Sequence, residues 1–158
     1  LSEIDNICAI KNDTPSEHTN ELRRLVGDKI VVSDPNEDNW LVNRSFNKQQ
    51  VFMASPSPHL LQWRNRLPIV EYTKAADAGD METAKRISAT LDPLRALTRK
   101  WIWAPWAAGA LPMARLKYWQ KLMGLAGGYV RAPLLEMSET EKTELRNDLQ
   151  AAGVPVNA

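Results

Sequence analysis

The sequence has few of the residue types that build disulfides and metal sites. Its 158 residues include one cysteine, Cys8, and two histidines, His18 and His59. A single cysteine cannot form a disulfide framework, and cysteines and histidines this few and this scattered lack the spacing of a structural zinc site. We therefore expect neither a metal nor another cofactor, and we expect a reducing cytoplasm as the compartment.

Long apolar runs and an excess of one charge are also absent. No run approaches the roughly 20 apolar residues of a membrane-spanning helix, and no charged-then-apolar signal segment opens the sequence. Twenty basic and nineteen acidic residues give a net charge of +1 without a basic stripe, so we expect neither a membrane nor nucleic acid as a partner. The first residue is Leu1 rather than methionine, and we expect the chain to be a piece of a longer protein.

What is present is the composition of a globular domain, with 44% hydrophobic and 25% charged residues. Short apolar segments typical of buried strands occur at residues 6–13, 29–33 and 50–55. The segments between them have helical patterns. Strands that alternate with helices in this way indicate β-α units and a parallel sheet, which places the chain in the α/β class.

From residue 58 onward the pattern is helical. We expect a helical stretch over residues 60–79 that Pro68 kinks, and a last helix that begins with a capping box made by Ser138 and Glu141. Residues 101–109 carry three tryptophans and a proline, and we expect them to form an irregular aromatic turn.

Lys11 ends the first predicted strand. The two-residue period of a strand puts Lys11 on the same face as Ile7 and Ala9, and Cys8 on the other face. A continuous apolar run predicts a strand buried on both faces, so this lysine points inward with its apolar neighbours. Two interpretations follow: Lys11 is a solvated residue at the strand's exit, or it is a functional residue at the mouth of a (β/α)8 barrel.

Four segments, taken in order, resemble the dihydrodipicolinate synthase and N-acetylneuraminate lyase superfamily, whose members are pyruvate-handling class I lyases. The segments are AIK at residues 9–11, VSDPNE at 32–37, VFMAS at 51–55, and a tail over 111–134 with LMGL and VRAPL. The resemblance covers nearly the whole chain. Each segment alone is a weak signal, and their order and spacing together make the match specific.

The resemblance implies the C-terminal part of a (β/α)8 TIM barrel, with about three parallel strands and a C-terminal helical layer. Residues 1–60 would be the last three β/α units, and residues 61–158 the last barrel helix and a helical extension of the same domain. The remaining strands are expected from an N-terminal half of the barrel, either missing or separate. Two unpaired edges of a parallel sheet are unstable alone. The resemblance also implies a homo-oligomer, a dimer or a tetramer.

The resemblance further implies a Schiff-base lyase or aldolase that acts on pyruvate plus an aldehyde, or on a 2-oxo sugar acid. Lys11 matches the family's imine-forming lysine. An amine attacks a carbonyl only in its neutral form, which burial at a barrel mouth favours for lysines in general. Asn36 and Glu37 match the turn where sugar-acid lyases bind substrate hydroxyls, and Ala54 and Ser55 match the substrate-lining end of the next strand.

The chain departs from the family pattern at four positions. Asp34 stands where the family usually has glycine, Pro56 and Pro58 stand where it usually has a small polar residue and an asparagine, and Asn12 replaces an acidic residue. These differences argue against a standard dihydrodipicolinate synthase pocket. The alternatives are nevertheless dihydrodipicolinate synthase proper, or an incomplete barrel fragment kept as a binding or regulatory subunit.

Overall fold

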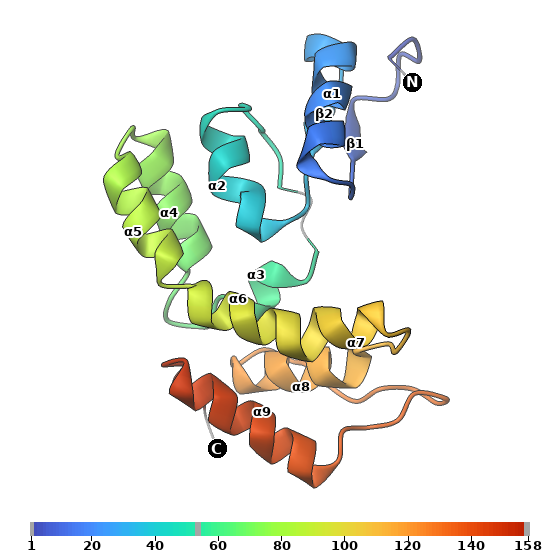
Figure 1. Cartoon of the computed structure of the whole chain (residues 1–158), viewed down its shortest axis with the longest axis vertical. Helices are drawn as coiled ribbons and strands as arrows, with labels where there is room; N and C mark the ends of the chain where they lie inside the picture. The colour runs from blue at the N-terminus through green and yellow to red at the C-terminus, as the bar shows by residue number, and fades with distance from the viewer. Residues whose placement is uncertain (1, 53–54, 157–158) are drawn as a thin grey trace. The chain divides into compact units, whose positions relative to one another are not determined.

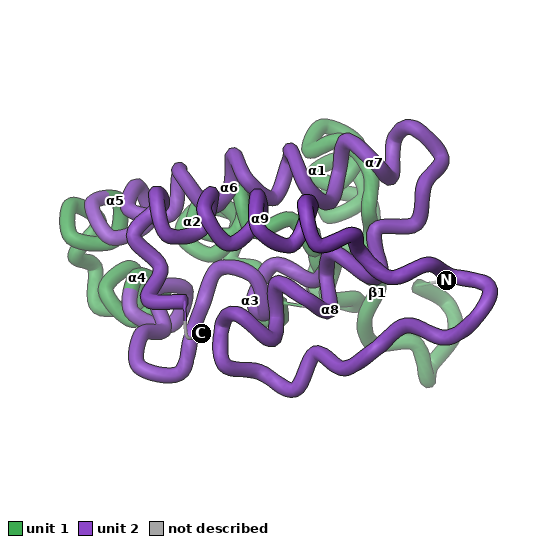
Figure 2. Tube along the Cα trace, turned by 90° about the horizontal axis from the view of Figure 1, so that it is seen from below, with its two compact units in different colours: residues 1–55, 72–85 green, residues 56–71, 86–158 purple. Residues whose placement is uncertain are grey.

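The computed structural model describes residues 2–52 and 55–156. The chain forms two compact units, which Figure 2 colours separately: unit 1 comprises residues 1–55 and 72–85, and unit 2 comprises residues 56–71 and 86–158. The chain passes from one unit to the other after Ser55 and again within helices α4 (Pro68–Asp77) and α5 (Met81–Ala89). These units are defined by packing and do not test the expected division after residue 60, which stays a prediction.

Unit 1 begins with a β-α-β arrangement. Strand β1 (Ala9–Lys11) pairs in parallel with strand β2 (Val31–Ser33), and Lys11 is in register with Ser33. Helix α1 (Ser16–Val26) and a 3₁₀ turn, η1 (Gly27–Lys29), connect the strands. Figure 1 shows the two strands side by side with α1 next to them. The predicted parallel pairing of these strands is confirmed.

The third predicted strand, at residues 50–55, is not assigned to any of the described residues of that segment, and residues 53–54 lie outside the description. The segment is instead attached to β2 by side chains. Ser33 Oγ donates a hydrogen bond of 2.9 Å to the carbonyl of Val51, and Gln49 Nε2 donates a second one of the same length. Side-chain donors, and not a backbone ladder, thus hold the carbonyl of Val51.

Helix α2 (Glu37–Ser45) follows the turn after β2 and contributes Trp40 to the core of unit 1. Trp40 is buried and stacks on Phe52 with ring centroids 4.8 Å apart. Its indole Nε1 donates a hydrogen bond of 2.8 Å to Thr73 Oγ1 in α4. A buried tryptophan needs such a partner for its N–H, and this bond ties α2 to α4.

Unit 2 is helical. Helix α6 (Asp92–Thr98), a π-helical turn η2 (Arg99–Trp103) and α7 (Ala104–Ala107) form one continuous rod beside α8 (Met113–Leu122) in Figure 1. Helix α9 (Glu139–Ala151) packs on α6 and α8, and the short α3 (Ser57–Leu60) packs on the same pair. The buried residues that these helices contribute to the core of unit 2 include Leu60, Leu94, Trp119, Leu145 and Leu149.

The prediction of an irregular aromatic turn at residues 101–109 is wrong, because residues 99–107 are helical. A proline inside an α-helix removes one hydrogen bond and clashes with the carbonyl four residues before it. Here the helix widens to the π form just before Pro105, and Ala104 N–H donates to the carbonyl of Arg99, five residues back. The wider turn changes the register at the position where the proline would otherwise clash.

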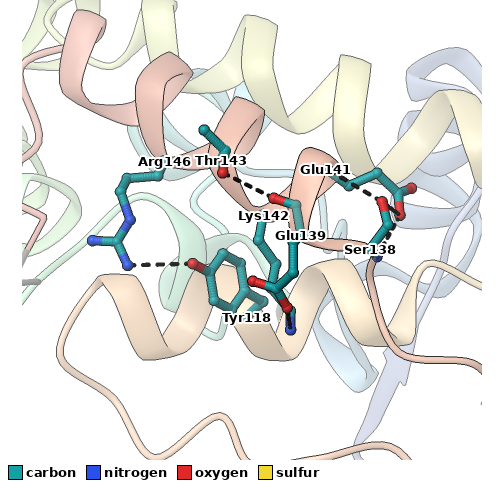
Figure 3. A network of polar contacts seen from close by, with 7 residues as sticks. All are labelled: Tyr118, Ser138, Glu139, Glu141, Lys142, Thr143 and Arg146. Carbon is teal, nitrogen blue, oxygen red and sulfur yellow. Dashed lines mark hydrogen bonds and ion pairs between the residues drawn. The ribbon is translucent and has the colours of Figure 1, made fainter.

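The expected kink at Pro68 is also wrong, because Pro68 is the first residue of α4 and no helix precedes it directly. A proline suits this position, where its missing N–H would have no helical partner. The predicted capping box of α9 is confirmed: Ser138 Oγ accepts from Glu141 N–H, and Glu141 accepts from Ser138 N–H. Figure 3 shows this box and the contact of Arg146 with the hydroxyl of Tyr118, which links α9 to α8.

Candidate active site

The candidate site lies at the carboxyl ends of β1 and β2. Lys11 and Ser33 are the last residues of their strands and lie opposite each other. Beyond them, Asn12 N–H donates a hydrogen bond of 2.9 Å to the carbonyl of Ser33. Since the strands are parallel, Lys11 and the turn that follows β2 come to the same edge of the sheet.

The face of β1 that carries Lys11 is exposed. Ala9 and Lys11 are both exposed, and Cys8, predicted as a buried residue on the other face, is exposed as well. The prediction of a strand buried on both faces is therefore wrong for this chain. The reason is physical: in the described residues β1 has a strand neighbour on one side only, β2, and two strands cannot enclose each other's faces.

The turn after β2 is organised by Asp34, whose side chain is fully buried. Asp34 Oδ1 accepts a hydrogen bond of 2.9 Å from the backbone N–H of Asn36. Asp34 Oδ2 accepts from Asn39 Nδ2 at 2.9 Å and from Asn43 Nδ2 at 3.1 Å, both on α2. The three donors compensate the loss of water around a buried carboxylate.

Arg23 and Gln49 complete the network around this turn. Arg23 Nη2 donates to Gln49 Oε1 at 2.6 Å, and Arg23 Nη1 donates to Asn43 Oδ1 at 3.0 Å. Gln49 in turn bonds the backbone of Asp34 twice, accepting from its N–H and donating to its carbonyl. Burial lowers the pKa of the Arg23 guanidinium, and the charge of Asp34 partly opposes this effect.

Glu37, the predicted substrate-binding carboxylate, is the first residue of α2 and is only 3% exposed. Its Oε1 accepts a hydrogen bond of 2.7 Å from the hydroxyl of Tyr72. Asn36, directly before it, is half-buried. The structure therefore anchors the predicted pair from both sides, by Asp34 at the backbone of Asn36 and by Tyr72 at the carboxylate of Glu37.

Ser55 joins the same edge through its backbone. Its N–H donates to the carbonyl of Pro35 at 3.4 Å, which brings Ser55 beside the turn after β2. Its Oγ is buried and has no hydrogen-bond partner in the part of the chain that the structure describes. Ala54, the other residue predicted at this position, lies outside the described residues.

Sequence reasoning singled out Lys11, Asn36, Glu37 and Ser55, and the structure brings the segments that carry them to one edge. It missed the residues that hold this edge together, which are Arg23, Asn43, Gln49 and Tyr72. One signal was available: Asn39 and Asn43 are four residues apart, so a helix presents both on the same side. Gln49 and Tyr72 lie far along the sequence from Asp34 and Glu37, which they bond at this edge, so no spacing indicated these contacts.

Two properties of the described residues bear on the kind of site. In residues 2–52 and 55–156, no group of three or more His, Cys, Asp or Glu side chains is placed to hold a metal ion. Among the helices described, none combines the length and the apolar character needed to cross a membrane.

Solved structures show which fold this arrangement belongs to. The crystal structure of dihydrodipicolinate synthase from Aquifex aeolicus matches 99% of this chain and 49% of its own length, with a TM-score of 0.69 and 22% identity. A second crystal structure of a dihydrodipicolinate synthase matches 96% of this chain and 47% of its own length, with a TM-score of 0.62 and 28% identity. The chain therefore has the fold of part of a (β/α)8 barrel and spans about half the length of these proteins.

Sequence comparison agrees with the fold. A 4-hydroxy-tetrahydrodipicolinate synthase of Corynebacterium jeikeium (strain K411) is 38% identical over 80 residues, which are 51% of this chain and 24% of that protein. No family model matches the chain. With the structural matches, this relative shows that the chain is similar to dihydrodipicolinate synthases over part of their length.

Proposed function

We propose that the complete protein, meaning this chain together with the strands that close the barrel, is a Schiff-base-forming lyase. Its substrates are pyruvate and an aldehyde, or a 2-oxo sugar acid. The observation that carries the proposal is the register of Lys11 with Ser33, which puts Lys11 at the carboxyl edge of a parallel sheet, the edge from which the turn of Asn36 and Glu37 also leaves. Catalytic residues of TIM barrels occupy this edge.

The proposed chemistry uses the Nζ of Lys11 as a nucleophile. The amine adds to the 2-oxo carbon, the carbonyl oxygen leaves as water, and an iminium forms. The iminium accepts the electron pair of the carbon–carbon bond that breaks, while the hydroxyl on carbon 4 loses its proton and its carbon departs as an aldehyde. The resulting enamine takes up a proton at carbon 3, and water then hydrolyses the iminium to pyruvate and free amine. No cofactor takes part in these steps.

Substrate binding is assigned to the residues around the turn. The side chains of Asn36 and Glu37 would bind hydroxyls of a sugar acid, since an amide both donates and accepts and a carboxylate accepts. Ala54 and Ser55 would line the same pocket. The buried Oγ of Ser55, which has no partner in the described residues, supports this assignment, because a substrate oxygen would satisfy it.

The completing strands are the partner that the proposal requires. They would pair with the free edge of β1 and cover Ala9 and Lys11, which are exposed in the chain by itself. We also propose that the complete protein forms a homo-oligomer.

A second candidate is dihydrodipicolinate synthase itself, which the names of the matched proteins favour. It would form the same imine but would not use hydroxyl contacts from Asn36 and Glu37. A binding or regulatory subunit without catalysis is the remaining alternative, and the exposure of Lys11 in the chain alone favours it.

Trapping of the imine tests the proposal. Borohydride reduces an imine to a stable secondary amine, so incubation of the complete protein with pyruvate and borohydride should label the peptide that contains Lys11. Lys11→Arg should abolish labelling and turnover, whereas Lys29→Arg, at an exposed lysine of η1, should change neither. The chain alone should label poorly, because Lys11 is open to water and no second half holds the carboxylate. Labelling of Lys29 or Lys117 with Lys11 untouched would end the aldolase proposal.

A further inference from the structure

We propose that Asp34 is a positioning residue: its buried carboxylate holds the turn of Asn36 and Glu37 in the geometry that binds substrate hydroxyls. The inference rests on the proposed function. It adds a specificity-determining residue that would not itself touch the substrate.

One carboxylate oxygen of Asp34 bonds the turn, and the other bonds helix α2. Oδ1 holds the backbone N–H of Asn36 at 2.9 Å. Oδ2 holds the side-chain amides of Asn39 and Asn43, one helical turn apart on α2. One side chain at the end of β2 therefore fixes both the path of the turn and the start of the helix that carries Glu37.

The position of Asp34 is itself fixed from the opposite side. Its backbone N–H and carbonyl are both bonded by the side-chain amide of Gln49, at 3.0 and 3.1 Å. Arg23 donates to Gln49, which bonds the backbone of Asp34, and to Asn43, which donates to the carboxylate of Asp34. The carboxylate is fully buried and both of its oxygens are hydrogen-bonded, and these bonds restrict its orientation, as a positioning role requires.

This arrangement matters for substrate choice more than for imine formation. Lys11 belongs to the neighbouring strand, and its backbone is held by the pairing of β1 with β2. Pyruvate has no hydroxyl chain to reach the turn of Asn36 and Glu37. A sugar acid does, and displacement of the turn by a fraction of an ångström weakens those bonds while leaving the amine in place.

The test compares two ligands in the complete protein. The probes are pyruvate, trapped on Lys11 with borohydride, and a six-carbon 3-deoxy-2-oxo acid with hydroxyls on carbons 4, 5 and 6. For Asp34→Ala we expect KM for the hydroxylated acid to rise by about tenfold or more, since a hydrogen-bonded anchor is lost. The extent of labelling of Lys11 by pyruvate should stay within about twofold of that of the wild type, a much smaller change than the tenfold rise in KM. Asp34→Asn keeps the shape of the side chain and one acceptor oxygen. Its KM for the hydroxylated acid should therefore lie between that of the wild type and that of Asp34→Ala.

Asp28→Asn is the matched control, because Asp28 is an exposed aspartate of η1, and its KM should equal that of the wild type. If Asp34→Ala does not fold, Asp34→Asn carries the test with the same two readouts. Equal losses for both ligands, or an unchanged KM in the folded variant, would overturn the positioning role. A wild type that labels with pyruvate but does not turn over the hydroxylated acid would also overturn it. A wild type that does not label at all would instead overturn the proposed function, and the positioning role with it.

Discussion

The hydroxyl of Tyr72 donates a hydrogen bond of 2.7 Å to Oε1 of Glu37, and both side chains are buried within unit 1. The bond joins the start of α2 to α4, across 35 residues of sequence. The phenol of Tyr72 thus contacts the carboxylate that we assign to substrate binding. The orientation of Glu37 is therefore set by a residue that belongs to a different helix.

Loss of this donor should destabilise the protein. Tyr72→Phe removes only the hydroxyl and leaves a buried carboxylate oxygen without that bond, so we expect a loss of about 1–3 kcal/mol in the free energy of unfolding. Urea denaturation of the complete protein measures it. Tyr129→Phe is the control, since Tyr129 is 84% exposed and should change stability by less than about 0.5 kcal/mol. Equal effects of the two variants would show that the bond to Glu37 contributes nothing.

Removal of the carboxylate should separate the two classes of substrate. For Glu37→Ala we expect binding of a hydroxylated 2-oxo acid to weaken by about 1–3 kcal/mol, through the loss of a charge-assisted hydrogen bond, with pyruvate binding nearly intact. Glu37→Gln keeps an oxygen for Tyr72 and separates the loss of charge from the loss of packing. Glu82→Gln, at an exposed position of α5, is the control. An equal loss for pyruvate would mean that Glu37 only supports the fold.

The capping box of α9 should contribute to stability. Ser138→Ala removes the hydroxyl that accepts from the N–H of Glu141, and we expect a loss of about 1 kcal/mol. Thermal unfolding monitored by circular dichroism measures it. Thr140→Ala lies next to the cap on an exposed position and should leave the midpoint nearly unchanged. A cap variant as stable as this control would contradict the role of the hydroxyl.

Glu141 should make part of this stability depend on pH. The backbone N–H of Ser138 lowers the pKa of Glu141 below its usual 4.5; burial opposes the shift, while the Ser138 hydroxyl and Arg115 add to it. A lowered pKa means that the carboxylate's contribution is present above the unfolded value and disappears as the pH falls through the folded value. The gap in stability between wild type and Glu141→Gln should therefore be full at pH 7, begin to narrow near the usual pKa of 4.5 and disappear as the pH falls through the lowered pKa of the folded protein. A gap that stayed constant down to pH 2 would contradict this account.

Any side chain at Gly127, in the loop after α8, should destabilise the protein. A Cβ on Gly127 would overlap the carbonyl oxygen of Lys117 in α8, while Lys117 Nζ holds the carbonyl of Gly127 at 3.1 Å. Because backbone must move, we expect Gly127→Ala to cost more than about 2 kcal/mol. Gly109→Ala meets no atom within 4 Å and suffers only from its positive φ of 82°, so it should cost about 1 kcal/mol. The order of the two variants in urea denaturation decides the point.

Several parts of the fold were predictable because they depend on neighbours in sequence. The strands ending at Lys11 and Ser33 follow from short apolar runs, and their parallel pairing follows from the helix between them. The capping box of α9 follows from a serine and a glutamate three residues apart. The helical form of residues 99–107 was not predicted in this way, because a proline usually breaks a helix, whereas here a π turn just before Pro105 accommodates it.

For the candidate site, the sequence by itself determined which residue types end or follow the strands: a lysine at the end of one apolar run, and an asparagine and a glutamate in the turn after the next. Periodicity and order along the chain suffice for this, because strand ends are local features. The tertiary structure alone decided what surrounds them. It buried Asp34 among amides from α2, placed Tyr72 behind Glu37, and left the face of Lys11 exposed. Burial and hydrogen bonding between distant segments depend on packing in three dimensions, and no local pattern of residues encodes them.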